Sequence, residues 1–337
     1  MKRVLVTGGC GHVGKMAVER LLRAGYTVKV IGLEQDAALP GAENEVCDIL
    51  NYERLRAAVH GCEAIVHLAA IATPNLAPSP QVFQTNVQGT FNVFQAAEAE
   101  GIRRVVQASS INALGMYYGV RPAPLHYLPL DEDHLVSGSD AYSFSKHLIE
   151  QIGDYFWRRA EISSVALRFP YVAPAEPNAY MLDSKQHMQA LVERLQSYPP
   201  EELRRWFEVN WEKFNAWRAA GSLEVPGVFE RIRAQGPPMP RDDFSAMVSR
   251  VNFFTRIDER DSAQALQRGL EAEYTGSHAL FINDDHNWSG VPTQVLLRLF
   301  YPDVHTFTAP LAGFDSLVSI TRAQQLLGFK VEHSFAP

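Results

Sequence analysis

The stretch Val4-Leu5-Val6-Thr7-Gly8-Gly9-Cys10-Gly11-His12-Val13-Gly14 decides the fold, because a short apolar run passes through a glycine-rich turn into an amphipathic segment. Two patterns overlap in it: GxGxxG at Gly9, Gly11 and Gly14, and TGxxGxxG at Gly8, Gly11 and Gly14. Both use glycine for a tight turn and for backbone contact with a pyrophosphate, and the next helix directs free N–H groups at the phosphates. The stretch predicts a strand, turn and helix that bind a dinucleotide, with an ordinary strand-to-helix turn as the alternative.

The same alternation of apolar runs and amphipathic stretches continues to about Phe169. The apolar runs are Val4–Val6, Val28–Ile31, a short one near Val46, Ala64–Ala69, Val105–Ser109 and Ser164–Phe169. A helical pattern over Gln81–Glu100 follows Pro80 and precedes Gly101, as helix boundaries often do. This order predicts an α/β fold with a doubly wound parallel sheet, a Rossmann domain over residues 1–169.

The rhythm changes after Pro170, and residues 170–337 are expected to form a smaller C-terminal α/β substrate lobe. Two helical patterns within 183–221 are separated by Tyr198-Pro199-Pro200, and a Pro/Gly-rich stretch follows up to Pro240. We interpret about 180–240 as a helical cap insertion. Further on, we expect helices over 262–272 and 293–300 and a strand over 279–282.

Composition excludes several function classes. The formal net charge is −7 without a long Lys/Arg run, which argues against a nucleic-acid partner. Three cysteines, Cys10, Cys47 and Cys62, show neither a disulfide pattern nor metal-ligand spacing, so no metal is expected. The N-terminal apolar run is too short for a signal segment or a membrane span. We expect a cytoplasmic enzyme with a small-molecule ligand.

The end of the second apolar run bears on cofactor choice. An acidic residue commonly holds the adenosine ribose there, but Gly32 occupies the position and Glu34 follows two residues later. A Glu34 that reaches the ribose favours NAD, because a carboxylate repels a 2′-phosphate; a solvated loop charge is the alternative. Lys15, just past the glycines, would attract that phosphate. We expect NAD, with NADP left open.

Tyr142 and Lys146 lie four residues apart in Tyr142-Ser143-Phe144-Ser145-Lys146 and so share one face of a predicted helix. Lowering a phenol pKa from about 10 by about three units takes roughly 4 kcal/mol of preferential phenolate stabilisation. Lys146 and an oxidised nicotinamide both supply positive charge for it, so Tyr142 is expected to exchange a proton with a substrate hydroxyl. Ser110, at the carboxyl end of the fifth run, would hydrogen-bond the reacting oxygen, or else only cap the strand.

Together these motifs resemble the extended short-chain dehydrogenase/reductases of the sugar epimerase/dehydratase group. The resemblance rests on several segments in the family's usual order: TGGCGHVG, Cys47-Asp48-Ile49, Val66-His67-Leu68-Ala69-Ala70, Asn86-Val87-Gln88-Gly89-Thr90, Ser110, YSFSK and Leu167-Arg168-Phe169. It covers the first half closely and the second half in outline.

The resemblance implies roles for individual residues. Tyr142 would be the general base or acid, Lys146 would also bind the nicotinamide ribose, Ser110 would orient the substrate and Asn86 would support the proton relay. The implied cofactor-binding residues are Gly8, Gly11, His12, Val13, Gly14, Glu34, Asp48 and Ile49 on the phosphate and adenine side, with Leu68, Ala69, Ala70 and Lys146. A buried histidine with a satisfied ring is at least as good an interpretation of His67 as a cofactor contact.

Departures from the family pattern narrow the chemistry. Ala113-Leu114-Gly115 replaces a common VYG, and Ile111-Asn112 replaces the Asp-Glu pair of the dehydratases, so water elimination loses its expected acid and base. The run Ser109-Ser110-Ile111-Asn112 is similar instead to uronate dehydrogenases. We expect an NAD(P)-dependent oxidoreductase or epimerase acting on a hydroxyl of a sugar or nucleotide sugar. A net uronate or aldose dehydrogenase is the alternative, and a non-catalytic NAD(P) sensor a weaker one.

Aromatic residues crowd into the expected cap. Trp206, Trp211 and Trp217 are interleaved with Phe207 and Phe214 at near-helical spacing. Packing in a core or at a subunit interface is the favoured interpretation, and stacking on a sugar is the alternative. A homodimer is expected.

Overall fold

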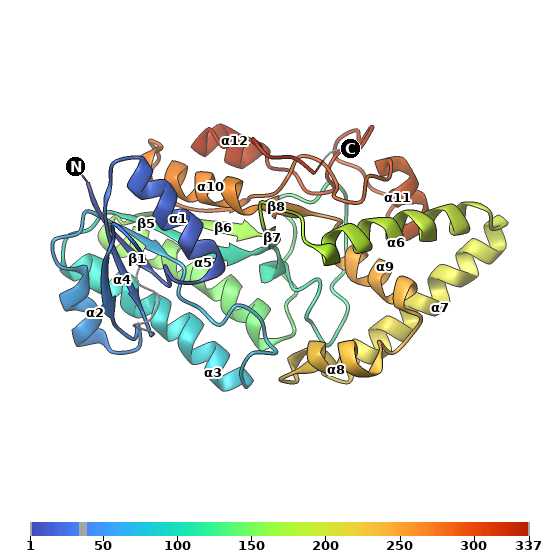
Figure 1. Ribbon diagram of the computed structural model, residues 1–337, viewed down its shortest axis with the longest axis horizontal. Helices are drawn as coiled ribbons and strands as arrows, with labels where there is room; N and C mark the ends of the chain where they lie inside the picture. The colour runs from blue at the N-terminus through green and yellow to red at the C-terminus, as the bar shows by residue number, and fades with distance from the viewer. Residues whose placement is uncertain (1, 34–38, 336–337) are drawn as a thin grey trace.

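The computed structural model describes residues 2–33 and 39–335 and is built around one seven-stranded parallel sheet, shown in Figure 1. The order across the sheet is β3-β2-β1-β4-β5-β6-β9. The strands are β1 (Arg3–Thr7), β2 (Thr27–Gly32), β3 (Glu43–Val46), β4 (Ala64–His67), β5 (Arg104–Ser110), β6 (Ser163–Phe169) and β9 (Ser277–Phe281). The central strands read as continuous apolar runs because helices cover both faces. The predicted doubly wound α/β fold is confirmed.

Two layers of helices bury the sheet. Helices α1 (His12–Arg23), α10 (Glu259–Glu271) and α12 (Thr321–Leu327) pack on one face. Helices α2 (Tyr52–Val59), α4 (Gly89–Ala99) and α5 (Ala141–Ala160) pack on the other. The predicted helix over 81–100 is a continuous run of α3 (Ser79–Phe83), a π-helical turn (Gln84–Gln88) and α4. Parallel strands with helices on both sides bring every strand's carboxyl end to one edge, where β1 and β4 separate the two halves.

The sheet extends past the boundary expected at residue 169. Strand β9 pairs with β6, from Ser164 opposite Ser277 to Arg168 opposite Phe281, and α10 packs against α1. Both segments were expected in the substrate lobe, and the chain returns to the sheet only after the long helical insertion. Because alternation of elements along the sequence does not show which sheet a late strand joins, the pattern left this strand unassigned. The two-domain division stays a prediction.

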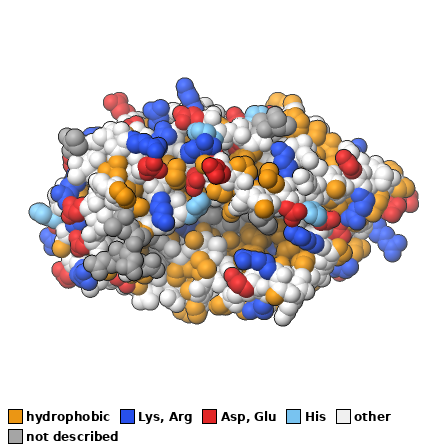
Figure 2. All heavy atoms as spheres, viewed as in Figure 1, with side chains coloured by type: hydrophobic (Ala, Val, Ile, Leu, Met, Phe, Trp, Pro, Cys, Tyr) orange, Lys and Arg blue, Asp and Glu red, His pale blue; other side chains and the backbone are white. Residues whose placement is uncertain are grey.

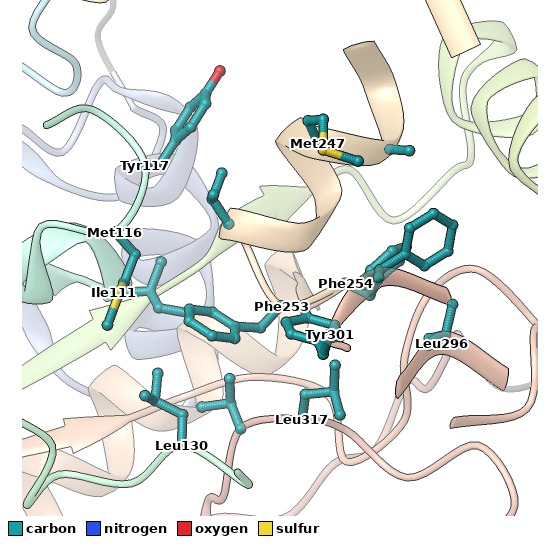
Figure 3. Packing of buried hydrophobic residues seen from close by; sticks show 14 of the residues in the cluster. Ile111, Met116, Tyr117, Leu130, Met247, Phe253, Phe254, Leu296, Tyr301 and Leu317 are labelled. Atoms are coloured by element: carbon teal, nitrogen blue, oxygen red, sulfur yellow. The ribbon is translucent and has the colours of Figure 1, made fainter. Parts of the chain in front are cut away.

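The insertion consists of four helices at one end of the molecule (Figure 1). They are α6 (Ala179–Gln196), α7 (Pro200–Ala219), α8 (Val228–Gln235) and α9 (Arg241–Val251), flanked by the two-stranded parallel sheet of β7 (Tyr171–Ala173) and β8 (Arg256–Asp258). We refer to α6–α9 as the cap. It packs against α11 (Thr293–Phe300) and the segment after β5; Figure 3 shows part of this cluster, with Met116 and Ile111 beside Phe253. Helix α8 lies in the stretch expected to be irregular.

The cap aromatics pack against one another, as the favoured interpretation held. Trp217 meets Phe244 edge-on at 5.2 Å between ring centroids, and Trp211 stacks on Phe214 at 6.1 Å. The Trp206 indole N–H donates to Asp243. These rings connect α7 to α9 and form the interior of the cap.

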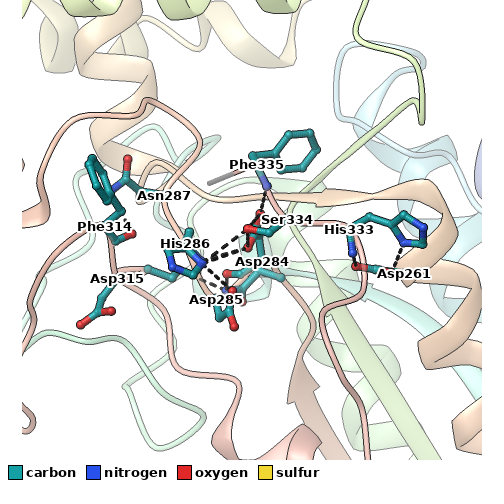
Figure 4. A network of polar contacts seen from close by, with 12 residues as sticks. Asp261, Asp284, Asp285, His286, Asn287, Phe314, Asp315, His333, Ser334 and Phe335 are labelled. Carbon is teal, nitrogen blue, oxygen red and sulfur yellow. Dashed lines mark hydrogen bonds and ion pairs between the residues drawn. The ribbon is translucent and has the colours of Figure 1, made fainter. Parts of the chain in front are cut away.

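Two carboxylates anchor the C-terminal segment, as Figure 4 shows. Asp261 accepts the backbone N–H groups of Glu332 and His333 at 3.0 and 2.9 Å, and its other oxygen lies 2.7 Å from the His333 ring. Asp284 accepts the Ser334 hydroxyl at 2.9 Å. Burial raises the pKa of Asp284 to about 6. The end of the described chain is thereby fixed over α10.

The surface carries charges of both signs. Lys and Arg side chains alternate with Asp and Glu over the face in Figure 2, without one dominant sign. Among the described residues, no helix combines the length and the hydrophobicity that crossing a membrane requires.

One buried ion pair joins α5 to the sheet. The Arg168 guanidinium of β6 donates through Nε and Nη2 to both oxygens of Glu150, at 2.9 and 2.8 Å. Ser109 of β5 donates to Glu150 Oε1 at 2.7 Å. Both charged side chains are about 95% removed from solvent. Glu150 therefore ties one helix to two adjacent strands.

We predict that Glu150→Gln lowers the free energy of unfolding by about 3–5 kcal/mol, because it leaves the Arg168 charge buried without a counter-ion. Urea denaturation measures the change. The exposed pair of Arg204 and Glu208 on α7 provides a control, since Glu208→Gln should cost about 0.5 kcal/mol or less. Combining Glu150→Leu with Arg168→Met should cost clearly less than the sum of the single changes, and strict additivity would contradict the coupling.

Candidate active site

Three of the four glycines in the β1–α1 turn and the first turn of α1, namely Gly8, Gly11 and Gly14, differ in their surroundings. Gly8 has a φ of +68°, and a Cβ there would lie 2.7 Å from the Ala69 nitrogen. A Cβ on Gly14 would lie 2.4 Å from the Gly8 carbonyl oxygen, so α1 can cross β1 only with glycine there. At Gly11 the nearest atom would be that same oxygen at 3.3 Å, and the residue is exposed. Gly8 and Gly14 are thus required by the fold, whereas Gly11 leaves a surface that a ligand can approach.

His12 and Val13 begin α1 beside this turn. Val13 is partly buried against the apolar layer beneath α1. The His12 ring is half exposed, with Nε2 3.2 Å from the Val172 carbonyl and Nδ1 3.6 Å from a Glu259 oxygen. The loop thereby contacts β7 and the start of α10.

The segment after β4 lies against the glycine turn. Leu68 and Ala69 donate their backbone N–H groups to the Thr7 hydroxyl, each at 3.1 Å. Ala70 is partly buried and, with Leu68 and Ala69, lines a small cavity. The structure therefore brings the residues expected from both motifs to one edge of the sheet.

The expected adenine side is partly described. Asp48 is exposed and accepts the Leu50 N–H at 2.9 Å. The Ile49 side chain is buried against Gly89 of α4, so only its backbone can face a ligand. Glu34 lies outside the described residues, and its expected ribose contact stays a prediction.

His67 has a satisfied, buried ring. Its Nδ1 lies 2.7 Å from the Thr7 hydroxyl and its Nε2 lies 2.9 Å from the Thr90 hydroxyl. Burial, together with the positive charge of Lys146, lowers the pKa of His67 to about 3. The ring is therefore neutral and structural.

Ser110 and Tyr142 meet at the carboxyl edge of the sheet. Ser110 ends β5, and its oxygen accepts the Asn112 N–H at 3.1 Å, capping the short 3-10 helix over Ile111–Leu114. Burial raises the pKa of Tyr142 to about 12; a hydrogen bond with Ser110 acts in the lowering direction, and the charge of Asp140 in the raising one. Without a bound cation the phenol is thus a proton donor, and the lowered pKa expected from Lys146 together with an oxidised nicotinamide stays a prediction.

Lys146 lies one helical turn beyond Tyr142 on α5. Its ammonium donates to the Ala108 carbonyl at 2.8 Å and lies 5.8 Å from the centre of the Tyr142 ring. Burial lowers the pKa of Lys146 to about 8, and the charge of Glu150 opposes this. Lys146 also lines the cavity next to Ala69 and Ala70. An ammonium has three donors, so this one retains capacity for further acceptors.

Asn86 fixes the catalytic helix from the other side. Its oxygen accepts the Ile71 N–H at 2.8 Å, and its amide donates to the Ile71 carbonyl at 3.1 Å and to the Ser145 hydroxyl at 3.0 Å. Ser145 in turn donates to the Tyr142 carbonyl at 2.7 Å. Asn86 stands within the π-helical turn, a local form often found at functional sites. A relay role for Asn86 stays a prediction.

Sequence reasoning missed the supporting residues. Ser109 and Glu150 hold α5 against the sheet, and Ser145 links α5 to Asn86 of the π-helical turn. Tyr118 meets Tyr142 edge-on at 5.4 Å between ring centroids. Glu150 carried a signal, since it lies four residues after Lys146 and shares its helix face. The contact of Tyr118 with Tyr142 carried no local signal, because Tyr118 lies in an irregular segment, although Tyr117 and Tyr118 beyond Gly115 are part of the similarity to uronate dehydrogenases.

The residues present fit a nicotinamide dinucleotide. Gly11 leaves the backbone of the α1 N-terminus open to a phosphate, and Lys146 keeps donors directed at the cavity edge. Tyr142 lies beside the Lys146 ammonium, and Ser110 is hydrogen-bonded to Tyr142. The arrangement can hold a dinucleotide along the carboxyl edge and pass a proton to or from a hydroxyl at its end.

Comparison with known proteins agrees with this geometry. Residues 4–211 match the family model described as NAD dependent epimerase/dehydratase family. A uronate dehydrogenase of Pseudomonas syringae pv. tomato is 26% identical over 264 residues, covering 75% of this chain and 92% of that protein. UDP-glucose 4-epimerase of Mus musculus is 30% identical over 174 residues, covering 45% of this chain and 48% of the enzyme.

A solved structure shares the fold over nearly the whole chain. It is a short-chain dehydrogenase/reductase superfamily protein from Agrobacterium tumefaciens with bound NAD, 23% identical, with a TM-score of 0.62. The likeness covers 99% of this chain and 93% of that one. With its glycine turn, its paired Tyr142 and Lys146 and its match over residues 4–211, the chain belongs to the NAD dependent epimerase/dehydratase family.

Proposed function

We propose that this protein is an NAD-dependent dehydrogenase that oxidises a hydroxyl of a free sugar or sugar acid. The observation that carries the proposal is the convergence of Ser110, Tyr142 and Lys146 at the carboxyl edge of the sheet, beside the open backbone at Gly11. The family membership supports the nicotinamide cofactor.

The chain's own residues account for the proton chemistry. When bound, oxidised NAD accepts the hydride from the carbinol carbon and places a positive charge near Tyr142. That charge lowers the free-energy cost of forming the Tyr142 phenolate, a cost that burial raises. Ser110 holds the substrate oxygen, Tyr142 takes its proton, and Lys146 binds the ribose and keeps positive charge close to the phenol. The product is a carbonyl compound, with NADH and one proton.

Relatives favour net dehydrogenation over epimerisation. The chain aligns with 92% of the Pseudomonas uronate dehydrogenase but with 48% of the mouse UDP-glucose epimerase. The Ile111-Asn112 pair after Ser110 points in the same direction. An epimerase would keep its cofactor and re-reduce the keto sugar on the other face, and the test below separates the two.

We predict that the wild-type chain, mixed with NAD and a panel of aldoses and uronates, releases one NADH per sugar oxidised. Tyr142→Phe should lower kcat by about 10²- to 10⁴-fold, because it removes the proton acceptor while keeping the ring. Absorbance of NADH follows both reactions.

Two outcomes would contradict this assignment. If Tyr142→Phe keeps more than about a tenth of the wild-type rate, Tyr142 is not the proton acceptor of the reaction. Cofactor that stays bound while a sugar is converted to its epimer makes the protein an epimerase instead.

The glycines supply a matched pair of variants. Gly11→Val should weaken NAD binding strongly and leave thermal stability near that of the wild type, because its side chain projects where the pyrophosphate must approach. Gly14→Ala should instead lower stability by roughly 1–3 kcal/mol, because its Cβ would collide with the Gly8 carbonyl. Calorimetric NAD titration and thermal unfolding separate the effects. Unchanged NAD affinity in Gly11→Val would refute the loop assignment.

We also propose a cytoplasmic homodimer. Four exposed aromatic rings from α3, α4 and α5 lie in pairs: Phe83 is stacked on Phe144, and Phe91 is tilted against Tyr155, each pair with ring centroids 6.1 Å apart. A second copy of the same helices would cover them by twofold symmetry. Cys47 and Cys62 are buried cysteines that form no disulfide, which suits a reducing compartment.

Light scattering tests the assembly. We predict about twice the chain mass for the wild type, and the single-chain mass for Phe144→Glu, because a charge would be buried in the interface. A wild-type chain that is monomeric at micromolar concentration would contradict the proposal.

A further inference from the structure

Arg218 is the largest fully buried side chain of the described chain, with 1% of its surface exposed. It lies in the last turn of cap helix α7. Its Nη1 donates to the carbonyl oxygens of Met116 and Tyr117, at 2.6 and 3.1 Å, and its Nη2 donates to Asn215 at 2.7 Å. A cap residue thus binds the backbone of a segment that begins six residues after Ser110.

Packing alone does not explain a guanidinium group at this buried position. Among residues 2–33 and 39–335 it forms no ion pair, and its buried Nε has no hydrogen-bond acceptor. The face of Phe214 lies 5.1 Å from it. Burial lowers the pKa of Arg218 to about 10, and the nearby charge of Arg250 acts in the same direction. The charge of Asp140 acts on the pKa of Arg218 in the raising direction, but no carboxylate of the described chain forms a direct ion pair with it. A buried cation without such a pair is costly, so packing alone would favour an apolar residue here.

The segment that Arg218 holds is fixed at its start and contacts the catalytic tyrosine at its end. Gly115 has a φ of +85°, and a Cβ there would lie 2.3 Å from the Gly138 Cα. Tyr117 and Tyr118 follow with ring centroids 4.5 Å apart. Tyr118 then meets the Tyr142 ring edge-on, with planes at 82°. Two neighbouring carbonyls held by one planar guanidinium determine how the peptide before Tyr118 is oriented.

We propose that Arg218 is a positioning residue for the reaction: through the carbonyls of Met116 and Tyr117 it sets the Tyr118 ring against Tyr142 and keeps water from the phenol. The inference rests on the proposed function, in which Tyr142 moves the proton. It gives the cap a role in the chemistry.

The groups around Tyr142 show what would change. Ser110 faces it from β5, Asp140 from the start of α5, Lys146 from the next turn of α5 and Tyr118 from the segment held by Arg218. Only 5% of Tyr142 is exposed, and burial is the largest influence on its pKa. Releasing Tyr118 admits water, which stabilises the phenolate and moves the pKa of Tyr142 down toward its ordinary value.

The experiment compares Arg218→Met with Arg205→Met, a change at an exposed arginine of the same helix. Full-length protein is labelled with ¹³Cζ-tyrosine, and the Tyr142 resonance is assigned by its loss in Tyr142→Phe. We expect Arg218→Met to lower the pH at which this resonance titrates by roughly 1 unit and to lower kcat by about 10²-fold, with NAD affinity unchanged. Arg205→Met should match the wild type in all three.

A second variant covers the case in which Arg218→Met does not fold. Tyr118→Ala should give the same downward shift of the Tyr142 pKa and the same loss of kcat. Tyr118→Phe should match the wild type in both, because it keeps the ring. The double variant Arg218→Met with Tyr118→Ala should lose no more kcat than either single variant. A Tyr142 titration that is unmoved in Tyr118→Ala or in folded Arg218→Met, or additive losses in the double variant, would overturn the proposal. Absence of sugar oxidation by the wild type refutes the proposed function alone, since the titration needs no substrate.

Discussion

The chemistry proposed for this protein depends on the interactions of the buried Glu150 carboxylate. It receives hydrogen bonds from Ser109 of β5 and Arg168 of β6, so α5 is fixed to two adjacent strands within the low-dielectric interior. Lys146 lies one turn before it and Tyr142 two turns before it on the same helix face. Asn86 holds the opposite side of α5 through Ser145. Because helix and strands cannot move independently, the phenol, the ammonium and the Ser110 hydroxyl keep a common geometry at the edge of the sheet.

The structure also separates residues that shape the fold from residues that face a ligand. Gly8 and Gly14 are required for the crossing of β1, β4 and α1, whereas Gly11 leaves its backbone exposed. His67 is neutral and engaged on both ring nitrogens. Lys146 is buried with one backbone acceptor and borders the cavity at the sheet edge. The cap adds an outer layer, in which Arg218 contacts the segment that packs against Tyr142.

Local patterns were enough to predict the sheet and the core of the site, because glycine turns, apolar runs and a four-residue helical spacing are encoded within a few residues. Six of the seven strands of the sheet followed from them. The seventh, β9, was expected as a strand over 279–282, but its place in this sheet was not predicted, because its pairing with β6 depends on a chain that returns after the whole cap. The raised pKa of Tyr142 did not follow from local patterns for a similar reason: burial is its largest cause, and burial is a property of the assembled fold. Arg218 resembled an ordinary solvated helix residue, since its acceptors lie about 100 positions away in the sequence.

A crystal structure of the full chain with NAD tests the central claim, that one edge of the sheet presents α5 to the nicotinamide end of a dinucleotide. The account predicts the pyrophosphate against the backbone at Gly11, the nicotinamide ribose about 3 Å from the Lys146 ammonium, and the Tyr142 hydroxyl facing the nicotinamide ring. A dinucleotide bound in another orientation, with its nicotinamide away from Tyr142 and Lys146, would contradict it.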